Sequence, residues 1–230
     1  MNQKGGIMKD YVSDCLVRDL ANRDPRIRQV LEQLGIDTCC GGGRNLYDAM
    51  REAGITGDQL NRSIELAMQE ADEPEKDWTR SSTKELLDCI VKIHHRYLYE
   101  KLPMLEEWFR RVLEAHAAHR EHLLPLQQTF LTIRSDLFPH LKQEETELFP
   151  ELENGSGEPE KRKKLIEKME SEHTAVGEAL KHLRKESRGY EYPEYACDTV
   201  RLLFDGLGEM DDMLREHIYL ENNVLFPRFL

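Results

Sequence analysis

Two short stretches of the sequence repeat one pattern of potential metal ligands. The first begins at His140 and reads HLKQEETELFP, and the second begins 77 residues later at His217 and reads HIYLENNVLFP. Both follow H-x3-E-x4-F-P, with a leucine before the phenylalanine. If each stretch is helical, its glutamate, Glu144 or Glu221, lies one turn after its histidine on the same helix face. An imidazole and a carboxylate on one face can bind the same metal ion.

Each repeat also has a histidine upstream, at nearly the same distance. His95 precedes His140 by 45 residues, and His173 precedes His217 by 44 residues. His173 lies among apolar residues at helical spacing, whereas helical periodicity does not distinguish His95 from His94. The repeat spacing favours His95. The sequence therefore predicts two helical hairpins that each supply one histidine and one His-x3-Glu pair.

Four imidazoles and two carboxylates that face one helical core require partners. Ionised carboxylates buried without compensation cost many kcal/mol. Two divalent metal ions supply the compensation when carboxylates bridge them at a separation of about 3.5–4 Å. Imidazole and carboxylate together suit iron, ahead of zinc or manganese. A single His-x3-Glu is usually a surface pair, but the duplication with matched upstream histidines favours a metal site.

A second chemical motif is the adjacent cysteine pair in GIDTCCGGG. Cys39 and Cys40 precede three glycines and a helix expected from about Asn45. Glycines let the backbone expose the thiols, and a helix N-terminus favours the thiolate. Such thiolates could ligate iron, react with nitric oxide or exchange with other thiols. The alternative is two small buried residues in a tight turn. The other cysteines are expected to be packing residues: Cys15, Cys89 and Cys197.

Composition limits the class of protein. The chain has 230 residues, of which 39% are hydrophobic and 33% charged, which is enough for a sizeable core. A net charge of -12 disfavours nucleic-acid binding. We expect no membrane span, because no run reaches the about 18 apolar residues that one needs. The first 20 residues lack an apolar signal core, and the five irregularly spaced cysteines do not form a disulfide framework, so a cytoplasmic location is expected.

The elements that must position these residues are expected to be helical almost throughout. Valine and isoleucine are sparse, and no stretch alternates apolar and polar residues for long. In the first part we expect helical segments within 12–34, interrupted near Asp24-Pro25, a helix from about Asn45, and another at about 56–70. The charged stretch 71–78 contains proline and lacks apolar periodicity, so it predicts a domain boundary.

The second part predicts an antiparallel four-helix bundle. Long amphipathic patterns run at about 82–111, 121–150, 159–186 and 193–226, and Phe-Pro is expected to end the second and fourth. Breaker residues occupy 153–159 and 187–193. The predicted fold is therefore all-α, with a small helical Cys-Cys domain at 1–73, a linker at 74–80 and the bundle at 81–230.

These motifs resemble a known family. The bundle looks like a hemerythrin-like domain, and GIDTCCGGGRNL resembles the short Cys-Cys domain that precedes it in RIC proteins, which repair iron centres. EKDW at the junction, SEH and HIYLENNVLFP also match that family. The resemblance covers nearly the whole chain and implies two carboxylate-bridged, non-haem iron ions. Carried over by motif, the ligands are His95, His140, Glu144, His173, His217 and Glu221, with His94 left open against His95.

The resemblance implies a protein that supports repair of iron–sulfur clusters damaged by nitrosative or oxidative stress. The expected small ligands are nitric oxide or dioxygen, and the expected partners are damaged or apo iron–sulfur proteins. The site would donate iron, bind and reduce nitric oxide, or both, so the question of enzymatic turnover stays open. The alternative is a sensor or carrier of dioxygen or nitric oxide without turnover. The Cys39-Cys40 motif favours repair, because simple carriage needs no second thiol domain.

Overall fold

The computed structural model describes residues 15–69, 76–155 and 158–230. The expectations for residues 1–14, for part of the boundary and linker segments and for part of 153–159 lie outside these ranges. In the described residues the backbone is helical, and the β-structure there is one isolated bridge between Leu16 and Asn45. The predicted all-α fold is confirmed. None of the helices in these ranges is long and apolar enough to cross a membrane.

The chain divides into two compact units. The first comprises Met1–Ser82, Tyr219–Arg228 and Leu230, and the second comprises Thr83–Ile218 and Phe229. Each unit is described by itself. The domain limits expected from the sequence, at 73 and 81, stay a prediction.

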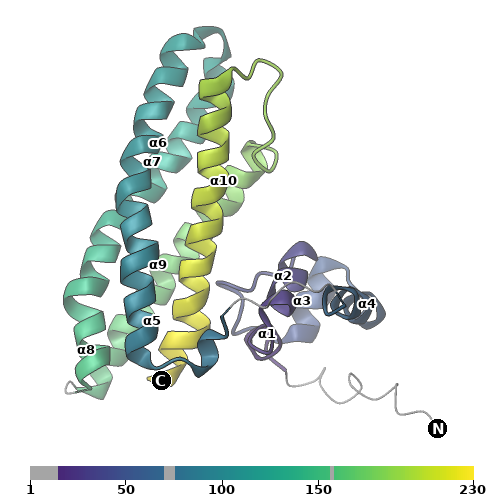
Figure 1. Cartoon of the computed structure of the whole chain (residues 1–230), viewed down its shortest axis with the longest axis vertical. Helices are drawn as coiled ribbons and strands as arrows, with labels where there is room; N and C mark the ends of the chain where they lie inside the picture. Colours follow the sequence, from purple (N-terminus) through teal and green to yellow (C-terminus); the bar gives the residue numbers. More distant parts are fainter. Residues whose placement is uncertain (1–14, 70–75, 156–157) are drawn as a thin grey trace. The chain divides into compact units, whose positions relative to one another are not determined.

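The four short helices of the first unit begin at side-chain caps where the sequence supplies them. They are α1 (Val17–Ala21), α2 (Pro25–Gln33), α3 (Leu46–Ala53) and α4 (Gly57–Ala67) (Figure 1). Asp24 caps α2 by accepting a hydrogen bond from the Arg26 backbone N–H at 2.9 Å. Asn45 caps α3 in the same way, and this helix begins near the residue that the sequence predicts; Thr56 caps α4. Their apolar faces meet in a small core in which Leu31 and Leu60 are fully buried.

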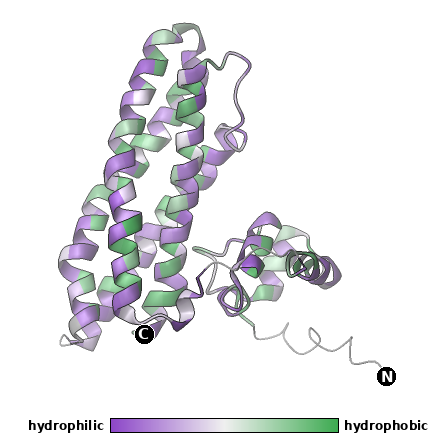
Figure 2. Cartoon of the chain, in the orientation of Figure 1, coloured by the Kyte–Doolittle hydropathy of each residue, from purple (hydrophilic) through white to green (hydrophobic). Residues whose placement is uncertain are grey.

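Long helices build the second unit, and short π-helical segments interrupt three of them. In chain order the elements are α5 (Thr83–Cys89), η2 (Ile90–His95), α6 (Arg96–Ala115), η3 (Ala117–His119), α7 (Arg120–Gln143), η4 (Glu144–Leu148), α8 (Phe149–Asn154), α9 (Pro159–Glu186) and α10 (Asp198–Tyr219). The helix α10 continues into η5 (Leu220–Leu225) and η6 (Phe226–Arg228), which belong to the first unit. The long helices run side by side (Figure 1). Hydrophobic and hydrophilic residues mix along each of them, as expected for amphipathic helices (Figure 2).

Three boundaries of the long helices differ from those predicted. The first helix, expected to end at about 111, continues as α6 to Ala115. Phe149-Pro150 does not end its helix, because the chain continues as α8 to Asn154. Pro150 lies just after the π segment η4, where the regular backbone hydrogen-bond pattern is already interrupted. The last long helix begins at Asp198 rather than near 193. The residues before it include Pro193 and Tyr190, the latter with a left-handed φ of 65°.

A buried carboxylate joins α9, α10 and the loop between them. Asp211 is fully buried, and its Oδ2 accepts hydrogen bonds from Nε of Arg184 and from the Tyr190 hydroxyl, both at 2.8 Å. Its Oδ1 accepts a hydrogen bond from Arg215 at 3.1 Å. Burial and the negative charge of Asp211 raise the pKa of Tyr190, so this hydroxyl stays a donor. The network fixes the loop against the helix pair.

The lone cysteines divide into inner and outer ones. Cys89 is buried and Cys15 is partly buried, in line with packing roles. The packing expectation is wrong for Cys197, which is exposed. Its Sγ lies 3.1 Å from Nε2 of His116. Cys197 falls within the helical pattern expected from about 193, but α10 begins only at Asp198, so this residue lies in the loop before the helix.

Candidate metal centre

The predicted ligands come from four long helical segments and meet at one level. Five of them offer ligand atoms that all lie within 4.8 Å of one another, and all five are buried: His140, Glu144, His173, His217 and Glu221. His95 lies beside this group, with its Nε2 3.4 Å from Oε2 of Glu144. All six residues that the sequence singled out are therefore brought together.

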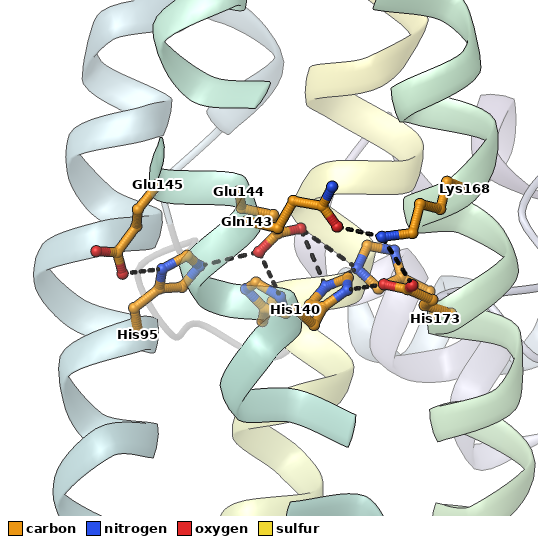
Figure 3. Close-up of polar contacts among 9 residues, drawn as sticks. His95, His140, Gln143, Glu144, Glu145, Lys168 and His173 are labelled. Atoms are coloured by element: carbon orange, nitrogen blue, oxygen red, sulfur yellow. Dashed lines mark hydrogen bonds and ion pairs between the residues drawn. The ribbon is translucent and has the colours of Figure 1, made fainter. Parts of the chain in front are cut away.

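Glu144 lies at the centre of the contacts. Its Oε1 is 3.0 Å from Nε2 of His140 and 3.7 Å from Nε2 of His173, while its Oε2 faces His95 and lies 4.0 Å from Nε2 of His217 (Figure 3). The imidazoles also touch one another, with Nε2 of His140 3.0 Å from Nε2 of His173. Such crowding of nitrogen and oxygen donors is the arrangement that cation binding needs.

Two further glutamates orient the histidines from outside the group. Oε1 of Glu145 accepts a hydrogen bond from Nδ1 of His95 at 2.8 Å, and Oε2 of Glu172 accepts one from Nδ1 of His140 at 2.7 Å. Each of these two histidines thus directs its Nε2 toward Glu144 (Figure 3). Histidines that bind metals typically donate their other N–H to such a carboxylate.

Sequence reasoning missed both orienting glutamates. Glu145 follows Glu144 directly and Glu172 precedes His173 directly, so each adjoins a predicted ligand. Both are partly exposed, and Lys168 lies 3.3 Å from Glu172. Burial raises the pKa of Glu172, but the hydrogen bonds from His140 and Lys168 outweigh it and lower that pKa. Glu172 thus remains an acceptor for the His140 N–H. Acidic residues adjoining the ligands were the available signal, but they also match an ordinary solvated helix face.

The protonation states within the group suit cation binding. Burial by itself raises the pKa of Glu144, but the charge of His140 and hydrogen bonds from His140, His173 and His95 lower it well below its usual value. Burial first, and the neighbouring imidazoles next, lower the pKa of His217 well below its usual value despite the opposing charge of Glu144. An ionised carboxylate and a neutral imidazole are the forms that coordinate metals.

His94 and His95 are both buried, but their surroundings differ. The ring centroid of His95 lies 5.2 Å from that of His217, and the ring of His94 lies 6.2 Å away. His95 also stacks on Phe149, with ring centroids 5.6 Å apart. The contacts with Glu144 and Glu145 belong to His95. Geometry therefore favours His95, as the repeat spacing does.

π-Helical turns occur where the ligands lie. η2 ends at His95, η4 begins at Glu144, and η5 contains Glu221. A π turn adds one residue to a helical turn, and such turns are frequent at functional sites. The two H-x3-E repeats share this local structure, since in each the glutamate lies in a π segment one turn after its histidine.

The donor set fits metal ions. Two buried carboxylates and four imidazoles offer enough donors for two ions, and a carboxylate is a group that can bridge two ions. The group is intermediate in hardness, which suits first-row divalent metals such as iron. The imidazoles would supply nitrogen donors, and no thiol belongs to the five-residue group.

The cysteine pair forms a separate group in the first unit. Sγ of Cys39 lies 3.8 Å from Sγ of Cys40 and 3.2 Å from Oδ1 of Asp37. Exposure of both thiols, expected from the glycines, is wrong for Cys39, which is only 3% exposed, while Cys40 is partly exposed. The side-chain amides of Asn222 and Asn223 donate hydrogen bonds to the carbonyl of Cys39.

Comparison with known proteins matches both parts of the chain. The family described as Hemerythrin HHE cation binding domain matches residues 86–229, which is more than half of the chain. The chain belongs to the hemerythrin HHE family. A second family, described as a domain of unknown function (DUF542), matches residues 13–68, where the Cys39-Cys40 motif lies. The predicted hemerythrin-like bundle with a small preceding helical domain is thereby confirmed.

Curated relatives cover nearly the full length of this hemerythrin HHE member. An iron-sulfur cluster repair protein YtfE from Yersinia pestis is 32% identical over 211 residues, which span 92% of this chain and 94% of the relative. The protein of the same name from Citrobacter koseri is 34% identical over 213 residues, with the same coverage. The predicted kinship with proteins for the repair of iron centres is confirmed.

Proposed function

We propose that this protein is a non-haem di-iron protein that supports the repair of iron–sulfur clusters damaged by nitrosative or oxidative stress. The gathering of two buried glutamates with the histidines of two sequence repeats carries the proposal. Its class follows from relatives that are named iron-sulfur cluster repair proteins and match 92% of the chain.

The proposed ligands of the two iron ions are the six residues of the metal centre. Glu144 and Glu221 would bridge the ions, and the imidazoles would complete them: His95, His140, His173 and His217. Bound iron would supply open positions for nitric oxide or dioxygen and a source of exchangeable iron. Glu145 and Glu172 hold His95 and His140 with Nε2 directed inward, which keeps the donors in place before iron arrives.

Burial of the donor residues also affects how the site binds cations. Glu144 and His217 are fully buried, and apolar residues such as Phe149 pack against the histidines. Electrostatic interactions are stronger in such surroundings than in water. The site therefore excludes bulk water while Glu144 stays ionised, and this favours retention of cations and entry of small uncharged molecules.

Cys39 and Cys40 are proposed to serve the same repair without holding the iron of the bundle. They belong to a separate group with Asp37, and the six bundle residues already provide nitrogen and oxygen donors. Thiolates bind iron and react with nitric oxide, so this pair suits transfer of either species. The proposed location is the cytoplasm, and the proposed protein partners are damaged or apo iron–sulfur proteins.

The test is reactivation of an iron–sulfur enzyme that nitric oxide has inactivated. Iron-loaded wild-type protein should restore its activity, whereas Glu144→Ala and Glu221→Ala variants should not, and His182→Ala serves as an exposed control. Anaerobic nitric oxide titration with detection of nitrous oxide tells reduction from simple binding. If nitric oxide binds reversibly while the enzyme stays inactive, the protein is a sensor or carrier and the repair proposal is wrong.

A further inference from the structure

We propose that Asp37, Cys39 and Cys40 form a second metal site, which binds one thiophilic divalent cation such as Fe²⁺. One ligand atom from each residue lies within 4.8 Å of the others. This inference deepens the proposed function and rests on the iron transfer proposed there for Cys39 and Cys40, because it adds Asp37 as a third donor and assigns one bound cation to the group. It can fail while the repair activity holds, and the reverse is also true.

The spacing of the two sulfur atoms matches one tetrahedral ion. With metal–sulfur bonds of about 2.3 Å, two thiolates on a tetrahedral ion lie about 3.8 Å apart. The Sγ atoms of Cys39 and Cys40 are 3.8 Å apart. The third donor, Oδ1 of Asp37, lies 3.2 Å from Sγ of Cys39, close to the about 3.5 Å between sulfur and oxygen donors on such an ion. The three donors thus already have nearly the spacing that binding requires.

Backbone groups hold the carboxylate at this site. Oδ1 of Asp37 accepts hydrogen bonds from the backbone N–H groups of Cys40 at 3.0 Å and Gly41 at 3.2 Å. A side chain at position 41 would bring its Cβ within 2.4 Å of the Asp37 carbonyl oxygen, so glycine is required there. The turn is therefore closed around the carboxylate, and little ordering is left for a cation to impose.

The backbone of the cysteine pair is fixed from the other side. Within the same unit, Nδ2 of Asn223 donates to the carbonyls of Thr38 and Cys39, both at 3.0 Å, and Nδ2 of Asn222 donates to the Cys39 carbonyl at 3.3 Å. A Cβ at Gly42 would lie 1.8 Å from Oδ1 of Asn223, which explains the second glycine. A third glycine, Gly43, has nothing within 4 Å of such a Cβ.

A divalent cation that binds at this site displaces protons from the thiols. The cation replaces the two thiol protons of Cys39 and Cys40, which pass to the buffer, and Asp37 binds as the carboxylate. Two thiolates and one carboxylate neutralise a divalent charge and leave one net negative charge. Three protein donors leave one position of a tetrahedral ion open. A partner's thiol could occupy it, so the site is built for exchange of the cation rather than for permanent retention.

The test is a Co²⁺ titration of the full-length, iron-free protein with its thiols reduced. Thiolate-to-cobalt charge transfer absorbs strongly in the near ultraviolet, whereas Co²⁺ bound by the histidines and glutamates of the bundle has no such band. All variants carry Cys197→Ser, because that exposed thiol lies 3.1 Å from a His116 nitrogen and could add a band of its own. We expect the charge-transfer band to saturate at one ion, with release of two protons.

Single variants assign the donors. Cys39→Ser and Cys40→Ser should each remove about half of the band, and the double variant should abolish it. Asp37→Asn retains an oxygen acceptor for the backbone N–H groups, so it should keep the fold and the band while weakening Co²⁺ binding by more than about tenfold. Cys89→Ser and Asp48→Asn are matched controls and should change nothing.

Two results would contradict the proposed metal site. One is a Cys197→Ser parent protein with four titratable thiols and no charge-transfer band, and the other is a band that persists when Cys39 and Cys40 are also replaced. Circular dichroism checks that each variant is folded. If the double variant does not fold, unchanged Co²⁺ affinity in Asp37→Asn contradicts the three-donor site on its own.

Discussion

Oε1 of Glu145 lies 2.8 Å from Nδ1 of His95 and fixes which nitrogen of that imidazole faces the metal centre. A carboxylate accepts, so Nδ1 of His95 is the donor in this hydrogen bond, and Nε2 is the ring nitrogen directed toward Glu144, 3.4 Å away. A residue that touches no ligand atom of the proposed ions therefore sets the chemical form of one ligand.

Glu145→Ala should weaken iron binding by about 10–100-fold, the usual effect of removing a partner of a ligating histidine. Iron content after dialysis against graded chelator measures the change. Glu147→Ala is the matched control, because Glu147 lies on the same segment, is exposed and bonds to Gln143. Equal iron retention in the two variants would contradict a role for Glu145.

His95→Ala should lose iron and change the absorption of the di-iron centre, whereas His94→Ala should retain both. The reason is that His95 lies beside Glu144 and Glu145, and the ring of His94 is farther from His217. Iron analysis and visible absorption at equal protein concentration measure the difference. The reverse pattern would transfer the ligand role to His94.

Glu144→Ala and Glu221→Ala should each reduce the iron content, because each removes a buried carboxylate that would bridge the two ions. Iron stoichiometry with Mössbauer spectroscopy separates loss of one ion from loss of both. His182→Ala, at an exposed residue of α9, should keep full iron. Both glutamate variants with full iron would exclude the bridging assignment.

The Cys39→Ser and Cys40→Ser double variant should keep the di-iron spectrum but repair a nitric-oxide-damaged enzyme more slowly. Imidazole and carboxylate donors complete the bundle site without sulfur. The rate of enzyme reactivation is compared with wild type at equal iron loading, and Cys89→Ser serves as the control. An unchanged rate would make the cysteine pair structural and leave the whole function to the bundle.

Asp211→Ala should lower the free energy of unfolding by about 3 kcal/mol, since it removes the acceptor shared by Arg184, Tyr190 and Arg215. This decrease in the free energy of unfolding is near the lower end of the range for removing one partner of a buried ion pair. The reason is that the Arg184 side chain is 43% exposed and can be hydrated. Urea denaturation measures it.

Asp212→Ala is the neighbouring control for this network. Its side chain is 79% exposed, so the change should stay within about 0.5 kcal/mol. Equal effects at positions 211 and 212 would show that the buried network does not stabilise the loop before α10.

The sequence predicts those parts of the site in which residue type and spacing repeat. Two H-x3-E pairs at a fixed offset, each with an upstream histidine, were enough to find all six clustered residues, because i and i+4 share a helix face. Helical periodicity could not separate His94 from His95, and the structure gives the reason. Both lie in the π segment η2, whose wider turn buries two consecutive residues.

The remaining errors come from contacts that no local pattern encodes. Glu145 and Glu172 resemble solvated helix residues until another helix brings a histidine within hydrogen-bond distance. Phe149-Pro150 resembles a helix end, but it follows the π segment η4, where the regular backbone hydrogen-bond pattern is already interrupted. Cys39 is buried, and its carbonyl accepts a hydrogen bond from Asn223, which lies far away in the sequence, so neither glycine nor helix position predicts its surroundings.

Because Gly42 lies close to Asn223, an evolutionary change at one of these two positions is expected to depend on the residue at the other. A Cβ at position 42 would lie 1.8 Å from the Asn223 side chain, so neither position can vary freely on its own. A lineage that gains a side chain at 42 must first lose the asparagine, and with it the amide that holds the Thr38 and Cys39 carbonyls. The cysteine turn and the last helical turns of the chain are thus expected to evolve as a pair.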